Sequence, residues 1–210
     1  MKRELQAPFE QFVTETMSRL QVPGVAVGIL QGGREYTAGF GITSIENPLP
    51  VTPETLFQIG STSKTVTATA IMRLVEAGKL DLEAKVRAYL PEFKLQSEGD
   101  AASVRVIDLL THLGGWVGDY FKDTGRNDDA IAIIVAKMAN SPQLTPCGSV
   151  WSYNNSGFYV AGRIIEVVSG LSFEAAIHEL VLKPLGMTRS FFSQDDLIPY
   201  RVAAGHTVFE

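Results

Sequence analysis

Residues 57–65 read Phe57-Gln58-Ile59-Gly60-Ser61-Thr62-Ser63-Lys64-Thr65. Ser61 and Lys64 are three residues apart, so a helix that begins near Ser61 brings the lysine ammonium within reach of the serine hydroxyl. Apolar residues follow at helical spacing as far as Val75, and Gly78 stands where a C-terminal cap is expected. The pattern predicts a helix with Ser61 at its N-terminus, where the helix dipole favours a developing oxyanion.

A serine and a lysine at this spacing also have an ordinary structural interpretation. Ser61 can be a helix N-cap, and Lys64 a solvated residue of the first turn. Two features favour a nucleophile instead. Gly60 allows close approach of the backbone before the serine, and the run 56–59 has the composition of a strand. An active-site serine at a strand-to-helix junction is the resulting hypothesis.

The composition is that of a globular protein. Hydrophobic residues make up 45% and charged residues 20%, the net charge is -5, and the 18 Lys and Arg residues are scattered, so we expect no nucleic-acid partner. Cys147 is the single cysteine, which excludes an internal disulfide and a thiolate metal site and predicts a structural thiol.

The same composition gives expectations about membranes and location. No apolar run is long enough to span a bilayer, and no secretory signal follows Met1. We therefore expect no membrane span and, for the chain as written, a cytoplasmic location. Removal of a leader before the chain's start would make the location periplasmic or secreted.

The first sixty residues predict a helix followed by two strands. Apolar residues from Leu5 to Leu20 form one helical face that ends before Pro23. The apolar run 25–30 is typical of a strand covered on both faces. The pair Gly32-Gly33 predicts a two-residue turn into a return strand at 34–40, so the sheet is expected to be antiparallel.

The sequence between residues 61 and 186 is mainly helical in pattern. Besides the Ser61 helix, helices are expected at 82–90, 104–113, 128–138, 158–168 and 173–182, and a surface loop at 98–102. Strand patterns return at 189–192 and 207–209. The predicted fold class is α+β, as one discontinuous catalytic domain with parts at 1–60, 61–186 and 187–210.

A second group of residues lies in the turn-rich stretch 151–157. Tyr153 and Asn155 form the pattern Y-x-N just before a predicted helix. A phenol beside the Lys64 ammonium has a lowered pKa, so it can accept the serine proton at neutral pH. The Asn155 amide can orient Lys64 and bind a substrate carbonyl or amide. The alternative is a surface Asx turn beside a packed tyrosine, but the S-x-x-K pattern upstream favours catalysis.

These motifs resemble those of the serine β-lactamase and penicillin-binding-protein superfamily. They are most like the branch that holds class C β-lactamases, D-alanyl-D-alanine carboxypeptidases and S-x-x-K esterases, because class A enzymes have S-D-N where this chain has Y-x-N. The likeness runs through most of the chain and includes 23–27, 57–64, 109–112, 153–157 and 183–187. It implies a β-lactamase/transpeptidase-like fold, with an antiparallel sheet, flanking helices and a mainly helical subdomain.

The resemblance also implies a role for each residue. Ser61 would attack the acyl carbon of a small ester, β-lactam or D-amino peptide and form an acyl-enzyme, while its N–H supplies half of an oxyanion hole. Lys64 and Tyr153 would share the proton transfers, with either as the base. Asn155 would hold the substrate. Neither a cofactor nor a metal is implied.

One motif of the family is missing from the sequence. The third motif, Lys/His-Thr-Gly or His-Gly-Gly on a strand of the sheet, would supply the second oxyanion-hole N–H. Gly205-His206-Thr207-Val208 has the wrong order, so His206 is interpreted as structural. We expect the chain to be the N-terminal part of a longer enzyme, completed by a second polypeptide or left by truncation, with an unpaired sheet edge and the C-terminal strands absent.

Other functional classes fit less well. A Ser-His-Asp hydrolase needs a G-x-S-x-G elbow and alternating strands and helices, which the sequence lacks. His112, His178 and His206 do not have the spacing of metal ligands. A penicillin-sensing domain that is acylated without turnover is the alternative function.

The motifs do not fix the substrate. Three aromatic residues follow the predicted helix 104–113, namely Trp116, Tyr120 and Phe121. They can line an apolar cleft that accepts esters, or they can simply pack in the core.

Overall fold

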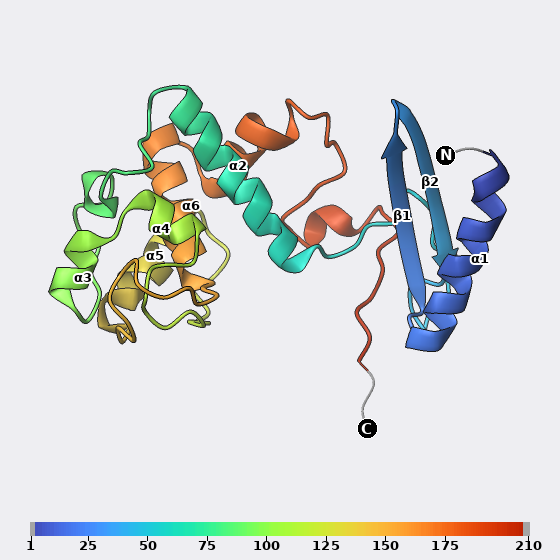
Figure 1. Ribbon diagram of the computed structural model, residues 1–210, viewed down its shortest axis with the longest axis horizontal. Coiled ribbons are helices and arrows are strands. Elements are labelled where there is room, and N and C mark those ends of the chain that lie inside the picture. The colour runs from blue at the N-terminus through green and yellow to red at the C-terminus, as the bar shows by residue number, and fades with distance from the viewer. Residues whose placement is uncertain (1–2, 208–210) are drawn as a thin grey trace. The chain divides into compact units, whose positions relative to one another are not determined.

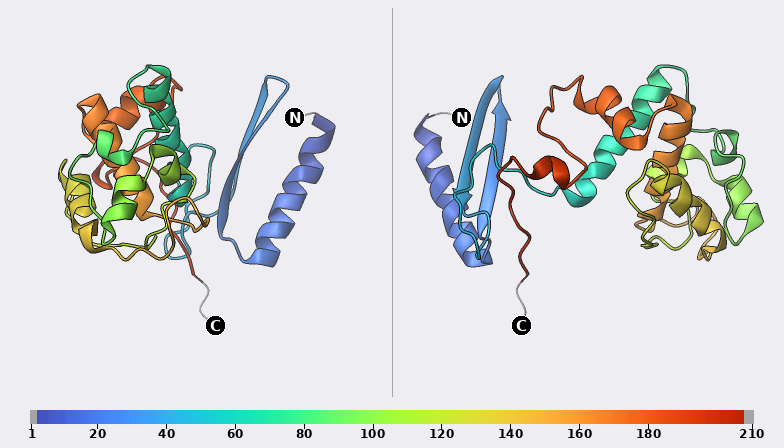
Figure 2. Two further views of the ribbon diagram at one scale, coloured as in Figure 1. Left: turned by 60° about the vertical axis from the view of Figure 1, so that its left-hand side comes forward. Right: turned by 180° about the vertical axis from the view of Figure 1, so that it is seen from behind.

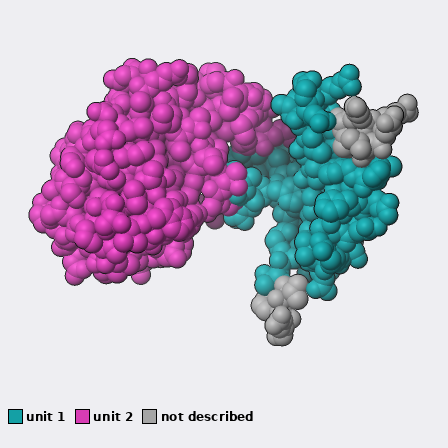
Figure 3. Space-filling view, viewed as in Figure 1, with its two compact units in different colours: residues 1–59, 191–210 teal, residues 60–190 magenta. Residues whose placement is uncertain are grey.

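The computed structural model (Figures 1 and 2) describes residues 3–207. The chain divides into two compact units, which Figure 3 distinguishes by colour. Unit 1 spans residues 1–59 and 191–210, and unit 2 spans residues 60–190. Ser61, Lys64, Tyr153 and Asn155 all belong to unit 2.

Unit 1 contains the predicted helix and hairpin. Its elements are α1 (Arg3–Leu20), β1 (Gly24–Gln31) and β2 (Arg34–Gly41), and the strands pair antiparallel along their whole length. Gly32 and Gly33 have φ angles of 57° and 73°, which residues with a side chain rarely adopt. The predicted glycine turn and the antiparallel sheet are thus confirmed.

Helix α1 lies along one face of the hairpin, as Figures 1 and 2 show. Phe9 meets the Tyr36 ring edge-on with centroids 6.0 Å apart, and the Tyr36 hydroxyl donates to Glu10 Oε1 at 2.8 Å. Alternate residues of β1 are exposed on the other face, and Leu30 is 72% exposed. Within residues 3–207 only one face of β1 is covered, although its apolar run is typical of a strand covered on both faces.

The other strand predictions in this part of the chain are wrong. Leu56 forms one parallel bridge with Val202 instead of a strand through Ile59, and its N–H donates to the Arg201 carbonyl at 2.8 Å. Residues 189–192 form no strand, since Arg189 lies in a turn and Phe192 at a bend. Of the run 207–209, residues 208 and 209 lie outside the described part, and Thr207 is not in a strand.

Unit 2 is helical. Its helices are α2 (Ser63–Glu76), α3 (Glu98–Ser103), α4 (Val106–Leu110), α5 (Ala130–Lys137), α6 (Ser156–Ser169) and α7 (Phe173–Ile177), which continues as a π-helical turn, His178–Leu182. Short 3-10 turns occur at Gly60–Thr62, Val86–Ala88 and Met138–Asn140, and in unit 1 at Asp195–Leu197.

Helix α6 is the centre of unit 2 and packs against α2, α4, α5 and α7 (Figure 1). Its inner face is fully buried at Val160, Ala161, Ile164 and Ile165. The helix stops at Gly170, whose φ of 73° is left-handed, as the sequence predicts. Because α6 begins directly after Asn155, its packing fixes where the second motif lies.

Two predictions of local structure in unit 2 fail for identifiable reasons. The expected helix at 82–90 contains only the 3-10 turn Val86–Ala88, because its backbone bonds to a distant segment: Val86 N–H donates to Val104 and Ile107 N–H donates to Leu82, both at 2.9 Å. For the same reason the helix expected at 104–113 shortens to α4.

The expected loop at 98–102 is helix α3. The Ser97 hydroxyl accepts from the Asp100 N–H at 3.3 Å and so caps the helix, and Ala101 is 1% exposed in the core. The sequence signal for this helix is a serine cap followed by acidic residues. Gly99 disfavours a helix, so the stretch resembles a loop in sequence.

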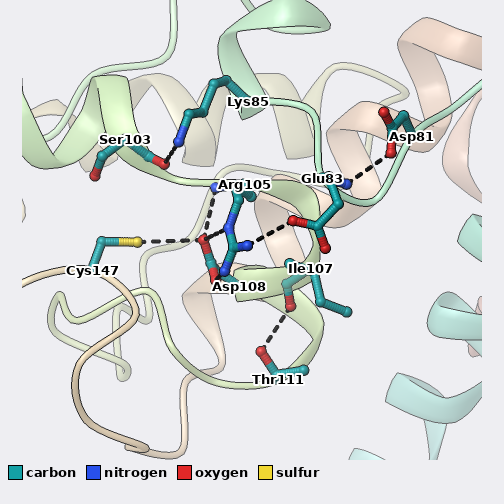
Figure 4. Close-up of polar contacts among 9 residues, drawn as sticks. All are labelled: Asp81, Glu83, Lys85, Ser103, Arg105, Ile107, Asp108, Thr111 and Cys147. Carbon is teal, nitrogen blue, oxygen red and sulfur yellow. Dashed lines mark hydrogen bonds and ion pairs between the residues drawn. The ribbon is translucent and has the colours of Figure 1, made fainter.

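An ion pair between Arg105 and the buried carboxylate of Asp108 fixes the start of α4 (Figure 4). The Asp108 side chain is 2% exposed and accepts from the Arg105 backbone N–H at 2.9 Å and from its guanidinium at 2.9 and 3.2 Å. Arg105 also donates to Glu83 at 2.7 Å. Burial opposes ionisation, but Arg105 holds the pKa of Asp108 below its ordinary value. Burial beside Asp108 raises the pKa of Cys147 to about 11, in agreement with a structural thiol.

Asp108→Ala is expected to lower the free energy of unfolding of unit 2 by about 3 kcal/mol. The change removes a helix cap and several charge-assisted hydrogen bonds. Both tryptophans, Trp116 and Trp151, lie in unit 2, so tryptophan fluorescence in a urea titration measures this unit. Glu83→Ala is the matched control, because Glu83 is 67% exposed and should contribute little. Equal effects of the two changes would contradict the assignment.

The stabilisation by Asp108 also depends on pH. Its folded pKa is lowered, so the contribution is fully present above the unfolded carboxyl pKa of about 4 and is lost as pH falls through the folded value. The difference between wild type and Asp108→Ala should therefore be largest near neutral pH and shrink in acid.

Candidate active site

Ser61 lies in the 3-10 turn Gly60–Thr62 that leads into α2. Gly60 has a φ of 50°, a left-handed conformation that disfavours any side chain. A Cβ atom at Gly60 would meet nothing within 4 Å, so the glycine is needed for its backbone conformation and not for close approach. The turn leaves Ser61 exposed at the N-terminal end of the helix.

Lys64 joins the two motifs. Its Nζ donates to Ser61 Oγ at 3.0 Å and to Asn155 Oδ1 at 2.6 Å. The same Nζ lies 4.8 Å from the centroid of the Tyr153 ring and 5.5 Å from that of Phe158. The structure thus brings together the four residues selected from the sequence, although Asn155 is 91 residues from Lys64.

The environment of Tyr153 acts on its acidity as the pattern predicts. A hydrogen bond with Lys64 lowers the pKa of Tyr153, and a hydrogen bond with Ser61 and the charge of Lys64 act in the same direction. Desolvation and the negative charge of Asp119 oppose them. Tyr153 is 44% exposed, so substrate and solvent can reach it.

The residue between Tyr153 and Asn155 holds the turn in place. Asn154 is 2% exposed, and its side chain donates to the Trp116 carbonyl at 3.0 Å. Its Oδ1 accepts from Ser156 Oγ at 2.9 Å and from the Gly157 N–H at 2.7 Å. A buried amide bonded through both its nitrogen and its oxygen gives the turn one conformation.

His112 is a site residue that sequence reasoning missed. Its Nδ1 accepts from the Asn154 N–H at 3.0 Å, and its ring lies 4.7 Å from that of Tyr153, with Trp151 and Phe158 within 6 Å. Burial and the charge of Lys64 lower the pKa of His112, which keeps Nδ1 available as an acceptor. The sequence places His112 in the family-like stretch 109–112 but assigns it no role in the site, and the available signal was its place directly after α4.

Asp119 is a second residue missed from the sequence. Its Oδ1 accepts from Asn155 Nδ2 at 2.7 Å. Of the aromatic residues near it, Trp116 is 2% exposed and donates to Ser156 Oγ at 2.8 Å, and Tyr120 donates to the Lys137 carbonyl. Trp116 and Tyr120 therefore pack and bond within unit 2, while Phe121 is 69% exposed.

The other two histidines lie in surface contacts. His178 lies 3.3 Å from Glu179, and His206 accepts from the Ile45 N–H at 3.1 Å in unit 1. Within the described residues, no three His, Cys, Asp or Glu side chains gather in a group that could hold a metal ion. None of the helices in residues 3–207 has both the length and the apolar character needed to cross a bilayer.

A sequence profile described as Beta-lactamase matches residues 9–208, nearly the whole chain. The chain belongs to the beta-lactamase family. Penicillin-binding protein 4 of Amycolatopsis lactamdurans is 36% identical over 185 residues, which cover 88% of this chain and 49% of that protein. An unguisins hydrolase of Aspergillus campestris is 30% identical over 200 residues, which cover 91% of this chain and 37% of the hydrolase.

Solved structures of the beta-lactamase family agree with the fold. An octameric penicillin-binding protein homologue from Pyrococcus abyssi matches with a TM-score of 0.81 and 34% identity, over 97% of this chain and 48% of that one. A class C beta-lactamase from Rhodobacter sphaeroides matches with a TM-score of 0.70 and 29% identity, over 90% and 52%. The predicted family and β-lactamase/transpeptidase-like fold are confirmed, and family membership supports a hydrolase or penicillin-binding role. The chain spans about half the length of these relatives or less.

Proposed function

We propose that this chain carries the nucleophile of a serine hydrolase that forms an acyl-enzyme on Ser61. The observation that supports this most directly is the position of Lys64, whose single ammonium contacts the Ser61 hydroxyl at 3.0 Å and the Asn155 amide at 2.6 Å. A solvated first-turn lysine would not need either contact. A lysine that controls a serine proton needs both.

The proposed reaction has two acyl-transfer steps. The Ser61 hydroxyl gives its proton to Tyr153 or Lys64 while Oγ bonds to the acyl carbon, and the leaving group takes a proton from the same pair. The backbone N–H of Ser61, in the 3-10 turn that leads into α2, stabilises the oxyanion. Water then attacks the acyl-enzyme by the reverse route and releases the acid. Asn155 orients the substrate through its amide.

The proposed substrates are a small ester, a β-lactam or a D-amino-acid amide. The names of the relatives support this range, since one is a penicillin-binding protein and one is a hydrolase of unguisins. A further matching structure, SurE with D-Leu, is 27% identical to this chain. Trp151 and Tyr153, which lie in the turn that carries the Y-x-N motif, are exposed and offer an apolar surface to such substrates.

Intact mass spectrometry tests the proposal. Incubation with a fluorophosphonate or a penicillin should add one equivalent of label to the chain. A chromogenic cephalosporin, a p-nitrophenyl ester and a D-alanyl-D-alanine peptide should then show which class is turned over. Labelling without turnover would favour the alternative, a penicillin-binding domain that is acylated and stays so. A folded sample that no reagent labels would contradict both for the isolated chain and would favour an incomplete half-domain that needs a second polypeptide for activity.

We also propose that the open face of the β1–β2 hairpin is covered by a second polypeptide equivalent to the remaining half of the relatives. Leu30 is 72% exposed on that face, and the strand edges are unpaired among residues 3–207. The isolated chain is therefore expected to self-associate or to bind such a polypeptide. Light scattering of the purified chain measures this, and a stable, monodisperse monomer with nothing bound would contradict the proposal.

A further inference from the structure

Asp119 is joined to the nucleophile Ser61 by a series of hydrogen bonds that runs through Lys64 and Asn155. Lys64 Nζ contacts Ser61 Oγ at 3.0 Å and Asn155 Oδ1 at 2.6 Å, and Asn155 Nδ2 donates to Asp119 Oδ1 at 2.7 Å. The four side chains form one continuous series of hydrogen bonds within unit 2. Asp119 contacts neither Ser61 nor Lys64 directly in this series, so it acts on them through the Asn155 amide.

The loop that carries Asp119 is tightly joined to the Y-x-N turn. The Asn154 amide donates to the Trp116 carbonyl at 3.0 Å, and the Ser156 N–H donates to the Gly118 carbonyl at 2.9 Å. A Cβ atom at Gly118 would lie 2.5 Å from the Tyr153 carbonyl oxygen, so only glycine permits this approach. The backbone before Asp119 is therefore held in a fixed position against the turn that carries Asn155.

We propose that Asp119 is a positioning residue that fixes the orientation of the Asn155 amide and so keeps the Lys64 amine directed at Ser61. The proposal rests on the proposed function. A carboxylate only accepts hydrogen bonds, so Asp119 binds the nitrogen side of the amide and leaves the oxygen facing Lys64.

The restraint matters for the route in which Lys64 is the base, because that route requires a free lone pair on its nitrogen. An ammonium has no lone pair and would itself select the amide oxygen. A neutral amine has a lone pair, and an unrestrained Asn155 could turn its nitrogen side to that lone pair and occupy it. Because Asp119 holds Nδ2, the lone pair stays free to accept the Ser61 proton. The second N–H of Nδ2 is directed by the same contact and is left for a substrate carbonyl.

The charge of Asp119 gives a second, separable effect. The charge of Asp119 raises the pKa of Tyr153, whereas Lys64 and Ser61 lower it. His112 is a further titratable residue here, because its ring contacts that of Tyr153. Removing the charge should therefore lower the pKa of Tyr153 further and move the acid limb of the acylation rate to lower pH. A side chain that merely stabilised the loop would not move this limb.

The test compares two substitutions in the full chain. Asp119→Ala should slow acylation by a fluorophosphonate by about 10–100-fold, since it frees the amide that aligns the reacting groups. Asp119→Asn can still accept the bond from Asn155, so its rate should stay within about threefold of wild type. Both should move the acid limb to lower pH. Asp123→Ala is the control, because Asp123 Oδ1 accepts from the Gly125 N–H of its own loop at 2.9 Å and should change neither quantity.

A readout that does not require acylation separates this inference from the proposed function. Carbon-13 labelled tyrosine gives the titration of Tyr153 by NMR, and the side-chain amide resonances of Asn155 report its hydrogen bonds. If wild type is not labelled but Asp119→Ala changes both signals, the proposed function fails and the positioning role stands. If wild type is labelled and Asp119→Ala behaves like Asp123→Ala, the positioning role is overturned. Equal losses in Asp119→Ala and Asp119→Asn with an unmoved acid limb would also overturn it.

Discussion

Ser61→Ala is expected to abolish covalent labelling by a fluorophosphonate or a penicillin. The reason is that Ser61 Oγ is the serine hydroxyl oxygen that accepts from Lys64 Nζ, at 3.0 Å. The effect should be total, because an acyl-enzyme cannot form without its nucleophile. Intact mass spectrometry of wild type and variant, incubated side by side, measures it directly.

The adjacent serine supplies a matched control for this experiment. Ser63 Oγ donates to the Gly60 carbonyl at 2.6 Å, so its hydroxyl is engaged with the backbone of the turn. Ser63→Ala should still be labelled. Cys147 cannot substitute for Ser61, because burial raises the pKa of its thiol to about 11. A label that persists in Ser61→Ala would show that the nucleophile lies elsewhere.

The parts of the site that were predictable from sequence are those set by local spacing. Ser61 and Lys64 are one helical turn apart, and the apolar pattern that follows them requires a helix, so their contact follows from short-range geometry. Tyr153 and Asn155 were found as a second motif, and the chemistry of an ammonium beside a phenol predicted that the two motifs meet. The 4.8 Å contact between Lys64 and the Tyr153 ring agrees with that prediction.

The residues that were missed act through tertiary structure. Asp119 and His112 reach the site only because their loops bond to the Asn154 turn, at distances that no local pattern encodes. The segment 82–90 is another case in which tertiary contacts override a local pattern. Its sequence predicts a helix, but its backbone forms hydrogen bonds with residues 104–107 instead. For β1, the apolar run was read correctly as a strand, but a pattern cannot show which layer covers it.

Lys64→Ala is expected to slow acylation at neutral pH by about 10²–10⁴-fold, the usual effect of losing an acid–base group. The variant loses the contacts of Nζ with Ser61 Oγ and Asn155 Oδ1 together. The labelling rate with a fluorophosphonate measures the loss. Lys183→Ala is the control, since Lys183 pairs with Glu179 on the surface at 2.8 Å and should label at the wild-type rate. A loss below tenfold in Lys64→Ala would contradict a role for Lys64 in proton transfer.

The pH dependence of the remaining rate assigns the base. The hydrogen bond with Lys64 is the largest cause that lowers the pKa of Tyr153, so the pKa should rise toward its ordinary value of about 10 in Lys64→Ala. If Tyr153 is the base, its phenolate becomes scarce at neutral pH, and the rate of the variant should climb as pH rises toward that value. Adding Tyr153→Phe should then remove the climb. If Lys64 is the base, the titration of Tyr153 does not affect the rate, and the residual rate of Lys64→Ala should be the same with tyrosine or phenylalanine at 153.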